Sequence, residues 1–240
     1  TAPTVAGRWR VHDVAAHLLD GDLRRLSMQR DGHRVAPPQP LETYPDLLRF
    51  LNQMNRTWGE VATRLSPGVL MELLEYSGPA TAALLEGIPS HAPAFLSVAW
   101  AGESQSEHWM DTGREYTERW HHQMQIRDAL RARHPALPAR LLGEPWLRPL
   151  IEIALRALPH AYRASPADDG DAIVMELVPS GAAPWEGVWS LAREHHAWRL
   201  HRGRAGTPRA AVRMDAESIW RLFFNAPQLA GDPAYPIVDG

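Results

Sequence analysis

EYTERWHHQMQIRDAL, residues 115–130, combines the apolar spacing of a long α-helix with two adjacent histidines. At 100° per residue its large apolar side chains recur on one side of the helix: Tyr116, Trp120, Ile126 and Leu130. Continued in both directions, this spacing predicts a helix from about residue 106 to residue 133.

Glu118 and His122 are four residues apart, so they share one face of this helix. On the wheel His122 lies at the edge of the apolar side, whereas His121 lies among polar residues and is expected to face solvent. A carboxylate and an imidazole on one face can bind a divalent ion such as zinc. With 12 histidines and 28 acidic residues in 240 positions, one or two such pairs are expected by chance, and the chain has two. Spacing alone therefore leaves a metal site and an ordinary surface pair both open.

Arg127 falls on the apolar side of the same helix, between Tyr116 and Trp120, where an isolated guanidinium would be costly. One interpretation is that Arg127 binds the carboxylate of a substrate, which makes it the candidate catalytic residue. The other is a buried pair with an acidic residue on a neighbouring helix. The sequence favours neither.

The composition limits the classes of function. A formal net charge of −3 gives no reason to expect a nucleic-acid partner, and no apolar run is long enough for a membrane span. The chain has no cysteine, so any metal must use His, Asp, Glu or backbone ligands, and any thiol must come from outside. The opening TAPTVAGRWRVHDV has no signal-peptide pattern, so we expect a cytoplasmic protein. We also expect a monomer or a homodimer that acts on a small molecule.

Helical periodicity before the long helix predicts helices over residues 11–30, 45–65 and 66–86, the last broken near Gly78 and Pro79. After the long helix, the proline-rich stretch RHPALPARLLGEP (133–145) is expected to be a domain boundary. We therefore predict an all-α domain over residues 1–142.

Beyond this boundary the period changes. A helix over 146–163 is followed by four segments of strand length at 171–178, 186–194, 197–203 and 208–214, and then by a final helix with Asp215 as its expected N-cap. This order predicts a small α+β domain over residues 143–240, with a mostly antiparallel sheet packed against helices on one face.

Three segments, taken in order, resemble the mycothiol-dependent maleylpyruvate isomerase family, which belongs to the DinB-like metal-binding helical bundles. GRWRVHDVAAHLLDGDLRRL (7–26) is similar to its Trp-x-Val-x-Asp-x-x-x-His-Leu opening. REYTERWHHQMQIRDAL (114–130) is similar to its Glu-x-x-x-His-x-x-x-Ile-Arg-x-Ala signature. GVWSLAREHHAWRLHRG (187–203) and DAESIWRLF (215–223) resemble its C-terminal domain, which is related in fold to sterol-carrier proteins. The resemblance implies a DinB-like up-down bundle followed by this small domain.

The resemblance also implies a ligand set of His17, Glu118 and His122 for Zn²⁺ or another divalent metal, with a coordination position left open. It implies a low-molecular-weight thiol, such as mycothiol, whose thiolate adds to the double bond of a cis unsaturated acid such as maleylpyruvate. The bond then rotates and the thiolate leaves, which gives the trans isomer. Related proteins transfer the thiol to other electrophiles.

Arg10 departs from the family, which has Ser or Thr there to cap the first helix, so that cap must be lost or supplied otherwise. Asp13 could orient His17 or serve the N-terminus of the helix, and we favour the helix role. The family has a further helix at each end, so the chain is expected to be a trimmed form, or its bundle lacks a helix. Two other functions stay open: a DinB-like metal-binding protein without thiol chemistry, such as a hydrolase, and a non-enzymatic carrier of small molecules.

Overall fold

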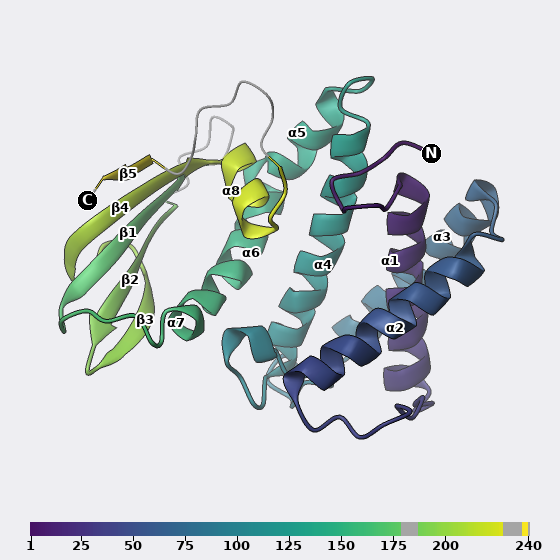
Figure 1. The fold of residues 1–240 in the computed structure, drawn as a ribbon, viewed down its shortest axis with the longest axis horizontal. Coiled ribbons are helices and arrows are strands. Elements are labelled where there is room, and N and C mark those ends of the chain that lie inside the picture. Colours follow the sequence, from purple (N-terminus) through teal and green to yellow (C-terminus); the bar gives the residue numbers. More distant parts are fainter. Residues whose placement is uncertain (179–186, 228–236, 240) are drawn as a thin grey trace.

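The computed structural model describes residues 1–178, 187–227 and 237–239. Its N-terminal part is helical and its C-terminal part adds a mixed sheet (Figure 1). The helices are α1 (Val11–Arg25), which continues into a π-helical turn (Leu26–Arg30), α2 (Tyr44–Ala62), α3 (Pro67–Glu86), α4 (His108–Ala129), α5 (Ala136–Leu142), α6 (Glu144–Ala154), α7 (Leu158–Ala161) and α8 (Ala216–Phe223), with short 3-10 turns at Ala99–Ala101 and Leu155–Ala157. Within the described residues, no helix combines the length and the apolarity required to cross a membrane.

The long helix α4 and the first helix α1 form the scaffold of the N-terminal part. Helix α1 packs against α2, α3 and α4. The Asp13 carboxylate accepts a hydrogen bond from the Arg10 backbone N–H at 2.9 Å, which is one half of a capping box, but the Arg10 side chain makes no cap hydrogen bond, so the Ser or Thr cap of the family is lost. Asp13 thus takes the helix role that we favoured. The predicted helices at 11–30 and 106–133 are confirmed to within a few residues.

Helix α3 is not broken near Gly78 and Pro79, contrary to the prediction, and runs from Pro67 to Glu86. Proline removes the hydrogen bond to the carbonyl four residues earlier, here that of Glu75. Both Glu75 and Pro79 are exposed, so water can reach that carbonyl. The Ser77 hydroxyl donates to Asp22 of α1 at 2.9 Å in the same turn. This long-range contact helps to hold α3 in place, and a local pattern cannot show it.

In the described part of the chain the sheet has five strands, in the order β3-β2-β1-β4-β5. The strands are β1 (Asp171–Val178), β2 (Val188–Glu194), β3 (Ala197–Arg202), β4 (Thr207–Asp215) and β5 (Ile237–Asp239). Three of the four pairings are antiparallel, as expected, but β1 and β4 are parallel neighbours. Position 186 of the predicted second strand lies outside the described residues. The Asp215 carboxylate accepts from the Ser218 N–H at 2.7 Å, which confirms the predicted N-cap of α8.

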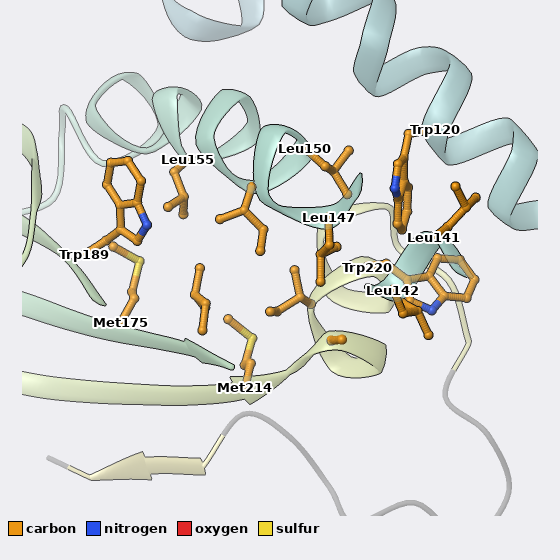
Figure 2. Close-up of a cluster of buried hydrophobic side chains, with 14 of the residues drawn as sticks. Trp120, Leu141, Leu142, Leu147, Leu150, Leu155, Met175, Trp189, Met214 and Trp220 are labelled. Carbon is orange, nitrogen blue, oxygen red and sulfur yellow. The ribbon is translucent and has the colours of Figure 1, made fainter. Parts of the chain in front are cut away.

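The main hydrophobic core lies between one face of the sheet and α6, and it extends to α4 (Figure 2). Leu147 and Leu150 of α6, with Leu155 of the 3-10 turn that follows it, face Met175 and Trp189 of the strands in this cluster. The sheet therefore packs against helices on one face, as predicted. The core continues to α4 and α5 through buried side chains that include Trp120, Met124, Leu141 and Leu142.

The stretch 133–145, expected to be a boundary, contains α5 and contributes Leu141 and Leu142 to the core. Its prolines do not prevent this, since Pro135 and Pro138 lie just before and within the first turn of α5, where the N–H groups have no intrahelical acceptor. Figure 1 shows α4 and α6 standing between the sheet and helices α1–α3. The division at residues 142 and 143 stays a prediction.

Candidate metal centre

Helices α1 and α4 bring together three side chains, one of which, His17, lies 101 residues before Glu118 in the sequence. His17 of α1 places its Nε2 at 3.4 Å from Oε1 of Glu118 on α4, and His122 Nε2 lies 3.3 Å from the same oxygen. The three ligand atoms all lie within 4.8 Å of one another. His17, Glu118 and His122 therefore form a group that could hold a metal ion, and the structure brings together the three residues that the sequence reading proposed.

The spacing of these atoms fits a small divalent ion. Two ligands that each lie about 2.1 Å from a tetrahedral ion are about 3.4 Å apart. The two Nε2-to-Oε1 distances match this value. One carboxylate oxygen and two imidazole nitrogens form a donor set that zinc and similar metals prefer. Three protein ligands also leave a fourth position free, as in catalytic zinc sites.

The charge and exposure of the group suit metal binding. Partial burial disfavours a charged Glu118, but hydrogen bonds with His122 and His17 outweigh it and hold the pKa of the Glu118 carboxyl well below its ordinary value. Glu118 is therefore ionised at neutral pH, as a ligand must be. The two histidine side chains are mostly buried, whereas about half of the Glu118 side chain is exposed. Solvent reaches the group from the Glu118 side.

Trp9 lies beside both histidine ligands. Its ring centroid is 5.1 Å from that of His17 and 6.3 Å from that of His122. The Trp9 carbonyl accepts from the Thr4 hydroxyl at 2.6 Å, and this contact fixes the segment that precedes α1. The tryptophan of the first motif thus packs against the metal-ligand group, a role that the sequence reading did not assign to it.

His121 is not solvent-facing, and the wheel prediction for it was wrong. Its ring stacks on that of Phe224, just after α8, with centroids 4.3 Å apart, and it is only partly exposed. Burial, with a smaller contribution from His122, lowers the pKa of His121 to about 4. A helical wheel describes one helix by itself and cannot show that Phe224 covers its polar side. The prediction that His122, and not His121, faces the other ligands is confirmed.

Arg127 lies away from the ligand group. It is nine residues from Glu118, which places it half a revolution around α4. Its guanidinium donates to the backbone carbonyl of Leu137 at 3.0 Å. Burial, with the nearby charge of Arg140, lowers the pKa of Arg127 below its ordinary value. In the described part of the chain this hydrogen bond goes to a carbonyl rather than to the acidic side chain that the second interpretation expected. Substrate binding by Arg127 stays a prediction.

A buried ion-pair network next to the ligand group was missed by the sequence reading. Arg25 of α1 donates to both oxygens of Asp111, at 2.8 and 3.1 Å, and to Glu115 at 3.0 Å. Asp22 pairs with Arg119 of α4. These contacts join α1 to α4 and so hold His17 opposite Glu118. The sequence signal for this network was the three- and four-residue spacing of polar residues along α4, which places Asp111, Glu115, Glu118 and His122 on one face.

Phe224, just after α8, brings the C-terminal part of the chain into contact with α4. Its ring stacks on His121 and also on Trp120, with 6.3 Å between the Trp120 and Phe224 centroids. The sequence-based expectation that this part forms one wall of a substrate pocket stays a prediction. Comparisons of the chain with protein-family models, with curated proteins and with solved structures return no match. The resemblance to the maleylpyruvate isomerase family therefore rests on the three sequence segments alone.

Proposed function

We propose that the protein is a metal-dependent enzyme, with zinc held by His17, Glu118 and His122, that activates a low-molecular-weight thiol. The observation that carries the proposal is the convergence of these three side chains, with two imidazole nitrogens at 3.3 and 3.4 Å from one ionised carboxylate oxygen. The order of the sequence motifs, which resembles that of the maleylpyruvate isomerase family with its DinB-like bundle, supports the choice of reaction.

Zinc bound at this site would supply a Lewis acid that ionises a thiol at neutral pH. The chain has no cysteine, so the thiol has to come from a second molecule such as mycothiol. The half-exposed Glu118 leaves a side from which that molecule can approach, while Trp9 covers the two histidines. The proposed reaction is cis–trans isomerisation of a small unsaturated acid such as maleylpyruvate, or transfer of the thiol to a related electrophile. A cytoplasmic location belongs to the same proposal.

The first test is the metal content of protein purified without chelator. Wild type is expected to carry about one zinc per chain, and Glu118→Ala is expected to lose it, because two histidines alone hold an ion too weakly to compete with water and buffer. Glu60→Ala is the matched control, since Glu60 is an exposed glutamate of α2 outside the ligand group. Equal metal content in wild type and Glu118→Ala would remove Glu118 from the ligand set.

The second test addresses the thiol. Cobalt-loaded protein should develop a sulfur-to-cobalt charge-transfer absorption when a small thiol is added, and maleylpyruvate should be isomerised only in its presence. A loaded metal site with no response to any thiol would favour a metal-binding protein without thiol chemistry. Wild type that binds no metal would favour a non-enzymatic carrier.

A further inference from the structure

Gln125 lies directly beneath the two adjacent histidines of α4. It is three residues after His122 and four after His121, so its side chain reaches both rings. Its Oε1 is 2.9 Å from His122 Nδ1, and its Nε2 is 2.6 Å from His121 Nε2. The Gln125 side chain is almost fully buried, so these contacts are shielded from water.

The chemistry of the amide assigns the protons. A carboxamide oxygen can only accept, so the His122 nitrogen beside it must donate from Nδ1. Nε2 is then the nitrogen that donates to Glu118, and it gives up that proton and offers its lone pair when a metal ion binds. That nitrogen is the one 3.3 Å from Glu118. Gln125 thus holds His122 in the tautomer that a metal ion bound through Nε2 requires.

The opposite orientation of the amide would have the reverse effect. The NH₂ group would then donate to His122 Nδ1, the ring proton would move to Nε2, and the lone pair would no longer face the ligand group. In the orientation seen, His121 Nε2 accepts from the amide NH₂, which places the His121 ring proton on Nδ1. The His121 ring is in turn fixed by stacking on Phe224.

We infer that Gln125 is a positioning residue that selects the metal-binding tautomer of His122, and that His121 and Phe224 fix the orientation of Gln125. This inference rests on the proposed metal site. It assigns a function to His121, which is not one of the three proposed ligands. It also links the ligand His122 to the C-terminal part of the chain through Phe224. Partners that orient a ligating histidine change metal affinity by 10–100-fold when they are removed.

The experiment compares Gln125→Leu, Gln125→Glu and His121→Phe with wild type. Metal affinity is measured by competition with a chromophoric zinc chelator. The protonation of His122 Nδ1, which distinguishes its tautomers, is read from the ¹⁵N shifts of its ring nitrogens in metal-free protein. Thr117→Val is the matched control, because it removes another buried hydrogen-bonding group of α4, the hydroxyl that donates to Arg114. Thermal melting shows whether each variant is folded.

Gln125→Leu is expected to bind zinc 10–100-fold more weakly and to lose the preference of His122 for Nδ1–H. Gln125→Glu keeps an acceptor beside His122 and should restore both the affinity and the tautomer. His121→Phe keeps an aromatic ring against Phe224 but removes the acceptor, so its affinity should fall between wild type and Gln125→Leu. Thr117→Val should match wild type in affinity and tautomer.

Two results would separate this inference from the proposed function. A wild type that binds no metal would overturn the metal site, and the His122 ring shifts of Gln125→Leu would then decide the tautomer by themselves. A wild type that binds zinc, together with a folded Gln125→Leu that has the same affinity and the same His122 tautomer, would overturn the role of Gln125 and leave the metal site standing.

Discussion

Asp111 is fully buried in α4 and carries a charge that the fold depends on. Its two oxygens accept from Arg25 of α1, and Arg114 of its own helix donates to it at 2.8 Å. Burial disfavours the ionised carboxylate, but the hydrogen bonds and charges of Arg25 and Arg114 outweigh burial and lower the pKa of Asp111. Because Arg25 belongs to the helix of His17, this contact fixes both sides of the metal-ligand group.

Asp111→Asn is expected to lower the free energy of unfolding at neutral pH by about 3 kcal/mol, since it leaves the buried Arg25 with one charged partner fewer. Because the folded pKa of Asp111 lies below the ordinary value of about 3.9, its contribution is present above that pH and is lost as the pH falls through the folded pKa. Wild type should therefore lose stability more steeply than Asp111→Asn below about pH 5. Urea unfolding followed by circular dichroism at a series of pH values measures both effects.

Asp31→Asn serves as the control for this comparison. Asp31 pairs with Arg30 in a setting where both side chains are about half exposed. Such pairs contribute less than about 1 kcal/mol. Parallel acid-unfolding curves for wild type and Asp111→Asn would show that the buried pair does not carry this part of the acid dependence.

At the scale of helices and strands, local periodicity predicted most of the fold. The first predicted strand, 171–178, coincides with β1, and the cap at Asp215 lies where its side-chain chemistry indicated. The features that periodicity did not predict share one physical cause. The continuity of α3 through Pro79 and the parallel pairing of β1 with β4 both involve contacts between distant segments. Periodicity within a window of residues contains no information about those contacts.

Pro79→Ala is expected to stabilise the protein by about 2 kcal/mol. Alanine supplies the N–H that can donate to the Glu75 carbonyl inside α3, and the full cost of an interior proline is about 3 kcal/mol. Part of that gain is offset because proline also restricts the unfolded chain. Urea unfolding gives the change directly. Pro67→Ala, in the first turn of the same helix, should have little effect because that N–H has no intrahelical acceptor. A less stable Pro79→Ala would mean that the ring itself makes a stabilising contact.

For the molecule as a whole, the candidate site was predictable only in part. The two sequence motifs indicated His17, Glu118 and His122, and the structure brings them together. The residues that hold these ligands in place could not be predicted in the same way. Arg25 contacts Asp111 from 86 positions away, and Phe224 covers His121 from the far end of the chain. Supporting contacts of this kind depend on how the helices pack, which the motifs do not specify.

The two parts of the chain share one core through α4, and this predicts how the protein unfolds. Trp120 and Met124 of α4 belong to the same buried cluster as Met175 and Trp189 of the sheet. Arg221 of α8 is buried and donates to Asp128 of α4 at 2.9 Å. A fold joined in this way should unfold in one cooperative transition, although the sequence predicts two domains.

Trp120→Ala tests this cooperativity, because it leaves a cavity where α4 meets the C-terminal part. The loss of a buried tryptophan should lower the free energy of unfolding by about 3–5 kcal/mol. Hydrogen exchange should show amides of α1 and of β1 losing protection by the same factor, since both open in the same event. Trp146→Ala, which removes a half-exposed tryptophan of α6, should have a much smaller effect. If β1 lost protection while α1 kept it, the two parts would be independent domains and Trp120 would stabilise only the second.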